Sequence, residues 1–534
     1  MAEAKGFRMP WAAISILILG SFMAYLDSSI VNVAIPTLRS AFAVGADEVE
    51  WVITAYLLVC GVAVPVSGYL IDRFGSKFMY IFCLGVFTLG SGLCSIAWSN
   101  SALVFFRVIQ AMGGGMMIPV SMSMIRIMVP RSEMGMALGV WGLSAMGGPA
   151  LGPTLGGYLV VNFGWPWIFT INIPIGLTTI FLSMFLLEET PRGKGLRFDL
   201  PGFLLISSAA FTLLLALSKG QEKGWNSLFI VDLLIYSVFG LVLFIIWEWK
   251  NPQPLIDLRL LKNRTYFVSL MAVSLSNIAM YSVIYLIPIY VQSVRGLTPL
   301  QSGMLTMPSA IATALMMPVS GRLVDRFGAM PLCIVGFAAA GYYSYQLHTL
   351  SYSCDLNELR WMLVKRSLGL GLAMMPMSTV GMKTIPRYLA SRASALNNLL
   401  RQISGSFGIA LATYVMMQRQ AYHEVRLGDT LTWSSYAALD AIARLKAVMV
   451  TQLGVPPAQA LFAAKAALGS ILAREAAIAG IDDAMLLAAS IFFMIIPLGL
   501  FMGKKAVSAE ARLQAKRFKP PAYLSEEWVR RLQR

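Results

Sequence analysis

Apolar runs of about 20 residues recur along the whole chain, which is the length that spans the roughly 30 Å hydrocarbon core of a bilayer. Of the 534 residues, 57% are hydrophobic and 13% are charged, whereas soluble domains carry about 25% charged residues. The sequence therefore predicts an all-α polytopic membrane protein embedded in a lipid bilayer. We expect fourteen transmembrane helices, at residues 11–36, 50–71, 78–98, 101–128, 134–161, 165–187, 200–218, 227–247, 267–292, 301–321, 330–349, 361–384, 390–416 and 484–503.

The distribution of Lys and Arg predicts the orientation. An even number of spans puts both termini on one side, and basic residues concentrate in cytoplasmic loops. With cytoplasmic termini, the net charge of +16 reflects basic loops that face anionic lipid, and it does not indicate a nucleic-acid partner. We therefore expect a multi-pass protein of the inner (cytoplasmic) membrane with both termini inside. The short outer loops then hold few basic residues, namely Arg39, Lys219, Lys223, Arg295 and Arg360.

A polar turn occurs twice, as SGYLIDRFGSK at residues 67–77 and as SGRLVDRFGAM at residues 320–330. Both copies fall on cytoplasmic turns, so the first six and the last six spans form two parallel halves with two spans inserted between them. Parallel halves are typical of transporters that expose a central site alternately to each side. The turns are either gates that hold the cytoplasmic side closed or plain topology signals, and we favour gates. The residues concerned are Gly68, Asp72, Arg73, Gly75, Lys77, Gly321, Asp325, Arg326 and Gly328.

The spans divide the chain into an N-terminal half (1–190), two inserted spans (191–250), a C-terminal half (251–505) and a cytoplasmic tail (506–534). The C-terminal half includes a long outer segment, 417–483. Tyr436–Leu453 and Ala458–Ala479 in this segment are amphipathic, which predicts two helices lying on the outer membrane surface. The tail is basic, which predicts a cytoplasmic helix followed by a loose end.

Asp27 is the outstanding ionisable residue within a span, where such residues are costly and are functional candidates. It can load and release a proton as water access alternates, or it can be permanently paired with an arginine. Arg107 lies at a similar depth in span 4 and shares a helix face with Gln110. We expect Asp27 and Arg107 to couple transport to protons.

The substrate cavity is expected between the halves. The chain has 32 Met, which either fill the core or form an adaptable wall for varied apolar ligands. The candidate cavity residues are Asn32, Gln110, Met116, Met374, Asn397 and Arg401.

Span 5 carries a dense run of Gly and Pro, AMGGPALGPTLGGYLV at residues 145–160. Glycines every four residues make a flat face for close helix packing, and prolines remove backbone donors and bend the helix. The residues of this run are Gly148, Pro149, Gly152, Pro153, Gly156 and Gly157.

The sequence lacks the motifs of several other functions. It has no phosphate-binding G-x-x-x-x-G-K-[ST] loop, and its only histidines, His348 and His423, fall at or beyond the outer face. We therefore expect no enzyme activity, no metal site and no cofactor, so that the energy for transport comes from an ion gradient or from the substrate's own gradient. Of these we favour a proton gradient.

The motifs around Asp27, GYLIDRFGSK at residues 68–77, Arg107 with Gln110, the Gly/Pro run and WIFTINIPIG at residues 167–176 resemble those of the major facilitator superfamily. The resemblance covers residues 10–505 and is to its fourteen-span drug:proton antiporters, the EmrB/QacA-like group. It implies the major facilitator fold, export rather than uptake, and coupling through Asp27 and Arg107. It also implies a periplasmic adaptor protein as a candidate partner. Spans 9–13 hold no clear deep acid, which disfavours dications as substrates.

Three functions compete, and a fourth, an uptake symporter, is disfavoured by the Gly/Pro run of span 5. The first is proton-coupled export of amphipathic or hydrophobic compounds, that is, multidrug efflux. The second is export of one physiological lipid-like or anionic compound, which the excess of buried Arg over Asp favours. The third is a membrane sensor or scaffold that transports nothing, against which the intact Asp27 and both turns argue.

Overall fold

The computed structural model describes residues 10–130, 133–193, 196–430, 436–501 and 503–517. These residues form a bundle of long helices, and no strand occurs in these ranges. Among the described residues, ten helical stretches are long and apolar enough to cross a membrane by length and composition. The all-α membrane fold is therefore confirmed, and the count of fourteen spans stays a prediction.

The first half of the bundle contains the helices that carry Asp27 and Arg107. Its sixth expected span is broken at Ile171, because Pro174 has no N–H to donate to the carbonyl of Thr170. The helices are α1 (Trp11–Phe42), α2 (Ala46–Phe74), α3 (Ser76–Ser95), α4 (Asn100–Met128), α5 (Met134–Phe163), α6 (Trp167–Thr170) and α7 (Asn172–Leu186).

The second half repeats this arrangement. The inserted helices α8 (Leu200–Lys223) and α9 (Leu228–Lys250) lie between the halves in sequence, and α8 packs on α2 and α14. The helices of the second half are η1 (Leu258–Lys262), α10 (Arg264–Ile289), η2 (Tyr290–Val294), α11 (Pro299–Phe327), α12 (Ala329–Gln346), η3 (Leu347–Thr349), α13 (Leu356–Lys383), η4 (Arg387–Leu389), α14 (Ala390–Thr430), α15 (Tyr436–Thr451) and α16 (Pro457–Leu500).

The halves meet along two pairs of helices, α5 with α11 and α2 with α14. These pairs are related by the repeat, because α2 and α5 occupy the places in the first half that α11 and α14 occupy in the second. The two repeated turns lie between α2 and α3 and between α11 and α12. We call the end of the bundle that holds them the turn end.

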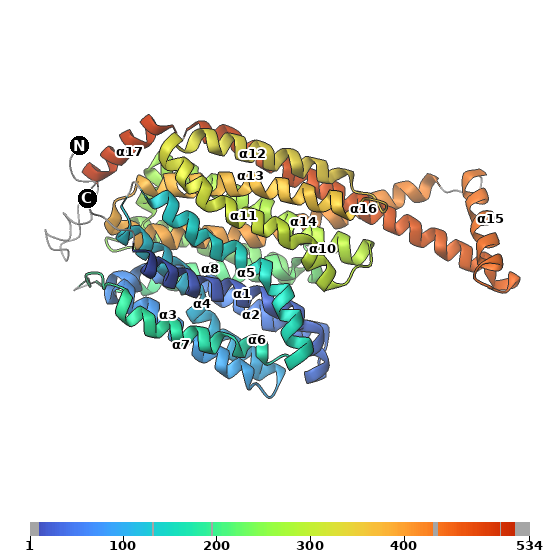
Figure 1. Ribbon diagram of the computed structural model, residues 1–534, viewed down its shortest axis with the longest axis horizontal. Helices are drawn as coiled ribbons and strands as arrows, with labels where there is room; N and C mark the ends of the chain where they lie inside the picture. The colour runs from blue at the N-terminus through green and yellow to red at the C-terminus, as the bar shows by residue number, and fades with distance from the viewer. Residues whose placement is uncertain (1–9, 131–132, 194–195, 431–435, 502, 518–534) are drawn as a thin grey trace.

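The opposite end differs from the sequence-based expectation. The segment Ala458–Ala479 is not a separate surface helix, because it belongs to the 44-residue helix α16, which continues into the last expected span. Helices α14 and α16 run side by side beyond the bundle and, with α15, form an arm that projects from it (Figure 1). Asp483 on α16 accepts from Arg419 and, at 2.9 Å, from His423, both on α14. These contacts join the two long helices, and the described part of the segment projects from the bundle (Figure 1).

The basic tail forms the helix α17 (Lys504–Arg517), as expected, and α17 packs on α10 and α13. The rest of the predicted tail, residues 518–534, lies outside the described residues.

Candidate functional site

A buried ion pair joins Asp27 on α1 to Arg107 on α4. Asp27 is 0% exposed and Arg107 is 1% exposed. Arg107 Nη1 donates to Asp27 Oδ2 at 2.5 Å, and its Nε donates to the carbonyl oxygen of Val52 at 3.2 Å. The guanidinium carbon also lies 3.9 Å from the centre of the Tyr56 ring. The structure thus brings together the two residues that the sequence placed at similar depth.

The other carboxylate oxygen of Asp27 accepts hydrogen bonds from two amides. Gln110 Nε2 donates to Asp27 Oδ1 at 2.8 Å, and Asn172 Nδ2 donates to it at 3.0 Å. Both amides also donate to Ser91 Oγ, at 2.7 and 3.3 Å. Each of these Asp27 contacts is with a donor, so a proton on the carboxylate would displace one of them and rearrange the network.

Asn172 is a member of this network that the sequence analysis did not single out. The helix break at Ile171 places it at the start of α7, where its side chain is 1% exposed. The available signal was an Asn two residues before a Pro within an apolar run. Tyr56 and Ser91 carried no such signal, because Tyr and Ser are common in membrane helices.

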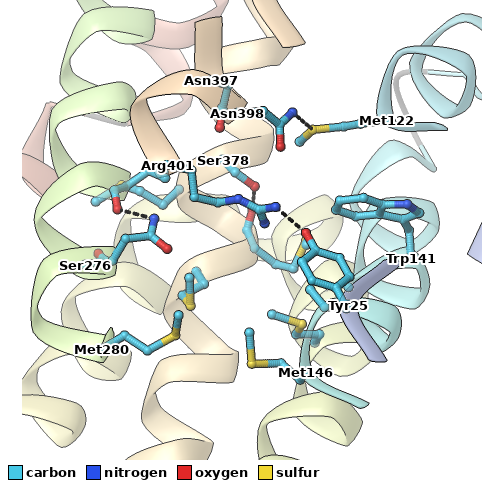
Figure 2. Close-up of a pocket in the computed structure, with 18 of the residues that line it drawn as sticks. Tyr25, Met122, Trp141, Met146, Ser276, Met280, Ser378, Asn397, Asn398 and Arg401 are labelled. Carbon is cyan, nitrogen blue, oxygen red and sulfur yellow. Dashed lines mark hydrogen bonds between the residues drawn. The ribbon is translucent and has the colours of Figure 1, made fainter. Parts of the chain in front are cut away.

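A cavity lies between the two halves, and Figure 2 shows its lining. Arg401 on α14 donates to the hydroxyl of Tyr25 on α1, so a hydrogen bond crosses from one half to the other. The cavity measures about 60 Å³, whereas pockets for drug-sized ligands run to roughly 300–1,000 Å³. Side chains must therefore move before a ligand of that size can enter, and unbranched Met side chains adapt readily. The sulfur-bearing residues of the wall are Met122, Met146, Met280, Met317, Met374, Met375 and Met377.

Three of the six residues proposed for the cavity line it, namely Met374, Asn397 and Arg401. The other three do not. Asn32 lies on the exposed side of α1, Gln110 is turned toward Asp27, and Met116 packs within the core of the first half. Position along a span did not reveal which side of the helix faces the cavity.

The glycines of α5 form a face that packs directly on α1. A Cβ added at Gly148 would lie 2.8 Å from the backbone nitrogen of Leu26, and one at Gly156 would lie 3.0 Å from the carbonyl oxygen of Ile30. A Cβ added at Gly152 would lie 2.5 Å from Ser29 Oγ. One added at Gly157 would meet only Val33, at 4.0 Å, so Gly157 lies off this face.

The prolines of α5 remove N–H donors that would pair with backbone carbonyls within the helix. Pro153 has no N–H, so the carbonyl of Pro149 loses its helical donor. Ser29 Oγ on α1 donates to that carbonyl at 3.3 Å. The Gly/Pro run therefore ties α5 to α1 both by close packing and by a hydrogen bond.

The first repeated turn holds the two halves together at the turn end. Asp72 Oδ1 accepts from Ser391 Oγ at 2.5 Å, and its Oδ2 accepts from Arg392 Nε at 3.2 Å. Ser391 and Arg392 lie in the first turn of α14, where a carboxylate is also favoured by the helix dipole. A Cβ added at Gly68 would lie 3.3 Å from Arg392 Cα, so this glycine permits the close approach.

The other residues of the first turn make contacts within the first half of the bundle. Gly75 has a φ of +91°, and a Cβ there would lie 2.3 Å from Glu189 Oε1. Glu189 accepts from the backbone N–H of Lys77 at 3.0 Å and so caps α3. Arg73 Nη1 donates to the carbonyl of Gly193 at 3.1 Å, and Lys77 Nζ donates to the carbonyl of Met184 at 2.6 Å.

The second turn packs on α5 as the first packs on α14. A Cβ added at Gly321 would lie 2.2 Å from the carbonyl oxygen of Gly135, and one at Gly135 would lie 2.9 Å from Asp325 Oδ2. Unlike Asp72, Asp325 forms its ion pair within its own half, with Lys383 Nζ at 2.8 Å. Gly328 has a φ of +90° and matches Gly75, and the Arg326 guanidinium lies 5.3 Å from the ring centre of Phe327.

We expect Asp72→Asn to open the turn end. The variant loses a charge-assisted contact worth about 1–2 kcal/mol, which would tilt a balanced equilibrium roughly 5- to 30-fold. The reporter is the rate of maleimide labelling of Ala395→Cys, because Ala395 lies on α14 beside Gly68. Asp325→Asn should increase labelling less, because its ion pair lies within one half, and the double variant should increase it most.

Glu188→Gln is the matched control, because this acid is exposed near the same turn. Labelling should not change in this variant. If wild type and both Asp variants are labelled equally fast, the turns are topology signals and not gates.

Three comparisons place the chain among known proteins. Residues 17–409 match the Major Facilitator Superfamily. The chain is 33% identical over 427 residues to the MFS-type transporter YhcA of Bacillus subtilis, and this match covers 80% of each protein. It is 28% identical over 439 residues to the multidrug export protein EmrB of Escherichia coli, covering 82% of this chain and 86% of EmrB.

The fold agrees with this assignment. The structure of the proton:xylose symporter XylE matches with a TM-score of 0.56 at 14% identity, covering 91% of this chain and 96% of XylE. At that identity the likeness concerns the fold alone. Given the sequence matches and the two packed halves, the chain belongs to the major facilitator superfamily.

Proposed function

We propose that the chain is a proton-coupled antiporter that exports amphipathic or hydrophobic compounds by alternating access. One observation carries the proposal: α1 bears Tyr25, which lines the cavity, two residues before Asp27, which lies in the buried network. Two residues correspond to about 200° around a helix, so the two side chains leave opposite sides of α1. A movement of α1 on ligand binding would therefore disturb the contacts of Asp27. The name and similarity of EmrB support export as the direction.

We place the turn end in the cytoplasm, with both termini, and the α14–α16 arm outside the membrane. In the conformation described here the halves touch at the turn end through Asp72 and Arg392. It would correspond to the state closed toward the cytoplasm. The opposite state would follow when these contacts break and the halves rock about the cavity. The arm is the segment available to an adaptor protein.

Transport into vesicles tests the proposal. The purified protein is reconstituted in liposomes, a pH gradient is imposed, and uptake is measured for a panel of dyes, fatty acids and bile salts. We expect accumulation of several amphipathic compounds that collapses when an ionophore removes the gradient. If accumulation is the same with and without the pH gradient, the protein is not a proton antiporter. If only one compound accumulates, the protein is not a multidrug exporter.

A second candidate substrate class is a lipid-like or anionic compound. Arg401 is the one ionisable cation on the described cavity wall, and no carboxylate lines it. An arginine in a poorly solvated wall favours a carboxylate or phosphate and disfavours a cation.

We expect Arg401→Met to reverse this preference. Removing a charge-assisted contact costs about 1.5–3 kcal/mol, so transport of an anionic amphiphile should fall at least roughly tenfold. Transport of a neutral analogue of the same shape should change little. Competition assays with matched anionic, neutral and cationic analogues measure the effect. An equal loss for all three would mean that Arg401 supports the contact with Tyr25 between the halves and does not select substrates by charge.

A further inference from the structure

Arg126 is a buried arginine that the proposed transport cycle does not use. It lies near the end of α4 at the turn end and is 2% exposed. Its Nη1 donates to Ser394 Oγ on α14 at 3.1 Å, but its Nε and Nη2 have no hydrogen-bond partner among the described residues. No described carboxylate forms an ion pair with it either, in contrast to Arg107.

Arg126 faces a small cavity that residues of both halves line. The first half contributes Arg126 and Met134, and the second half contributes the segment that joins α13 to α14. Two further cations line it: Lys383, which is paired with Asp325, and Arg387, whose Nη2 donates to the carbonyl of Val129 at 3.0 Å. The residues of this segment that line the cavity are Met382, Lys383, Ile385, Pro386, Arg387 and Ala390, so no described carboxylate faces it.

Burying a guanidinium with no counter-charge is strongly unfavourable unless another group compensates for it. The two unpartnered N–H groups, the enclosing cations and the cavity define what can do so. The ligand must be an anion, it must accept hydrogen bonds, and it must be small, because the centre of a water-sized sphere has only about 10 Å³ in which to move within the cavity. We propose that a chloride-sized inorganic anion binds here, between Arg126, Lys383 and Arg387. A phosphate or a lipid headgroup is too large for this space.

The site has a consequence for gating. Its wall comes from α4 and α5 on one side and from α13, η4 and α14 on the other, so it exists only while the halves touch at the turn end. A ligand that binds one state and not the other shifts the equilibrium toward the state it binds. The anion would therefore hold the turn end closed, beside the contact between Asp72 and Arg392. This effect concerns the closed state alone and does not depend on which compound is exported.

The test is chloride dependence of cysteine labelling. Ala395→Cys, in a background with Cys354→Ser, is reconstituted in zwitterionic liposomes and labelled with a maleimide while sodium chloride replaces sodium gluconate at constant ionic strength. Gluconate is too large for the cavity. We expect labelling to slow about fivefold or more as chloride rises, since couplings between sites commonly lie between 5- and 150-fold. A repeat with anionic liposomes in gluconate should give no protection, which separates free anion from headgroup.

Three variants decide the assignment. Arg126→Met should label at a rate that chloride does not change, and Arg126→Lys should keep a weaker dependence. Arg322→Gln, which removes an exposed cation at the same end, should behave like the parent protein. If the parent shows no chloride dependence, or if Arg126→Met keeps it in full, the site is hydrated and binds no anion. Should Arg126→Met fail to fold, the parent and the Lys variant still give either answer.

Discussion

In Asp27→Asn, a pH gradient should no longer drive accumulation of substrate. One proton that crosses about 100 mV carries ~2.3 kcal/mol, and each pH unit adds ~1.4 kcal/mol. Together these sustain a substrate gradient of roughly a few hundred-fold, because each 1.4 kcal/mol corresponds to a factor of ten. An amide cannot carry the proton, so the variant should bring the substrate to equal concentrations on both sides of the membrane but should not accumulate it further. The measurement is the accumulation ratio in proteoliposomes with and without the gradient.

The control for this variant is the protein's own exchange activity. Asn has the size of Asp, and its one amide oxygen can still accept from Gln110 and Asn172 although its NH2 group cannot accept from Arg107, so exchange of labelled for unlabelled substrate should persist. The double variant Asp27→Asn with Arg107→Gln removes both charges and so avoids an unpaired buried cation. It should be stable and equally uncoupled. An unchanged accumulation ratio in Asp27→Asn would exclude this carboxylate as the proton carrier.

Arg107→Ala should have the second-largest effect, on both stability and pH dependence. Removing one partner of a buried ion pair costs about 3–5 kcal/mol, because it leaves the other charge unpaired. The substitution also removes the positive charge beside the proposed proton carrier, so the pH optimum of transport should move upward. Thermal unfolding and the pH profile of transport measure the two effects.

Arg366 offers a matched control for that experiment. It lies in α13, the counterpart of α4, and is 4% exposed, and its Nε donates to Ser344 Oγ at 2.9 Å. No described carboxylate pairs with it. Arg366→Ala should therefore reduce stability without moving the pH optimum. If both variants shift the optimum equally, the shift reflects general loosening of the bundle and not the charge next to Asp27.

Much of the fold could be predicted because lipid leaves few alternatives. A chain in hydrocarbon must pair its backbone groups internally, so each long apolar run forms a helix. The repeated turn then predicted that the first and last groups of spans form two halves with the same arrangement of helices. The arm could not be predicted, because the polar and apolar residues of 417–483 fit a surface helix as well as a projecting one. The contacts of Asp483 with Arg419 and His423 join helices that are distant in sequence.

The candidate site was predictable where charge was the signal. Asp27 and Arg107 stand out because ionised groups are rare in membrane helices. Asn172 did not stand out, because its place beside Asp27 depends on how α7 packs against α1. The bond between Arg401 and Tyr25 depends on how the two halves approach each other, which a single sequence does not contain.

The most direct test of proton-coupled antiport is proton release on substrate binding. Purified protein in weakly buffered solution is mixed with a transported substrate while a pH-sensitive dye is followed. If substrate and proton compete through the Asp27 network, wild type should release up to about one proton per molecule, and Asp27→Asn should bind the same substrate and release none. Binding to wild type without any release, or equal release from both proteins, would contradict the coupling.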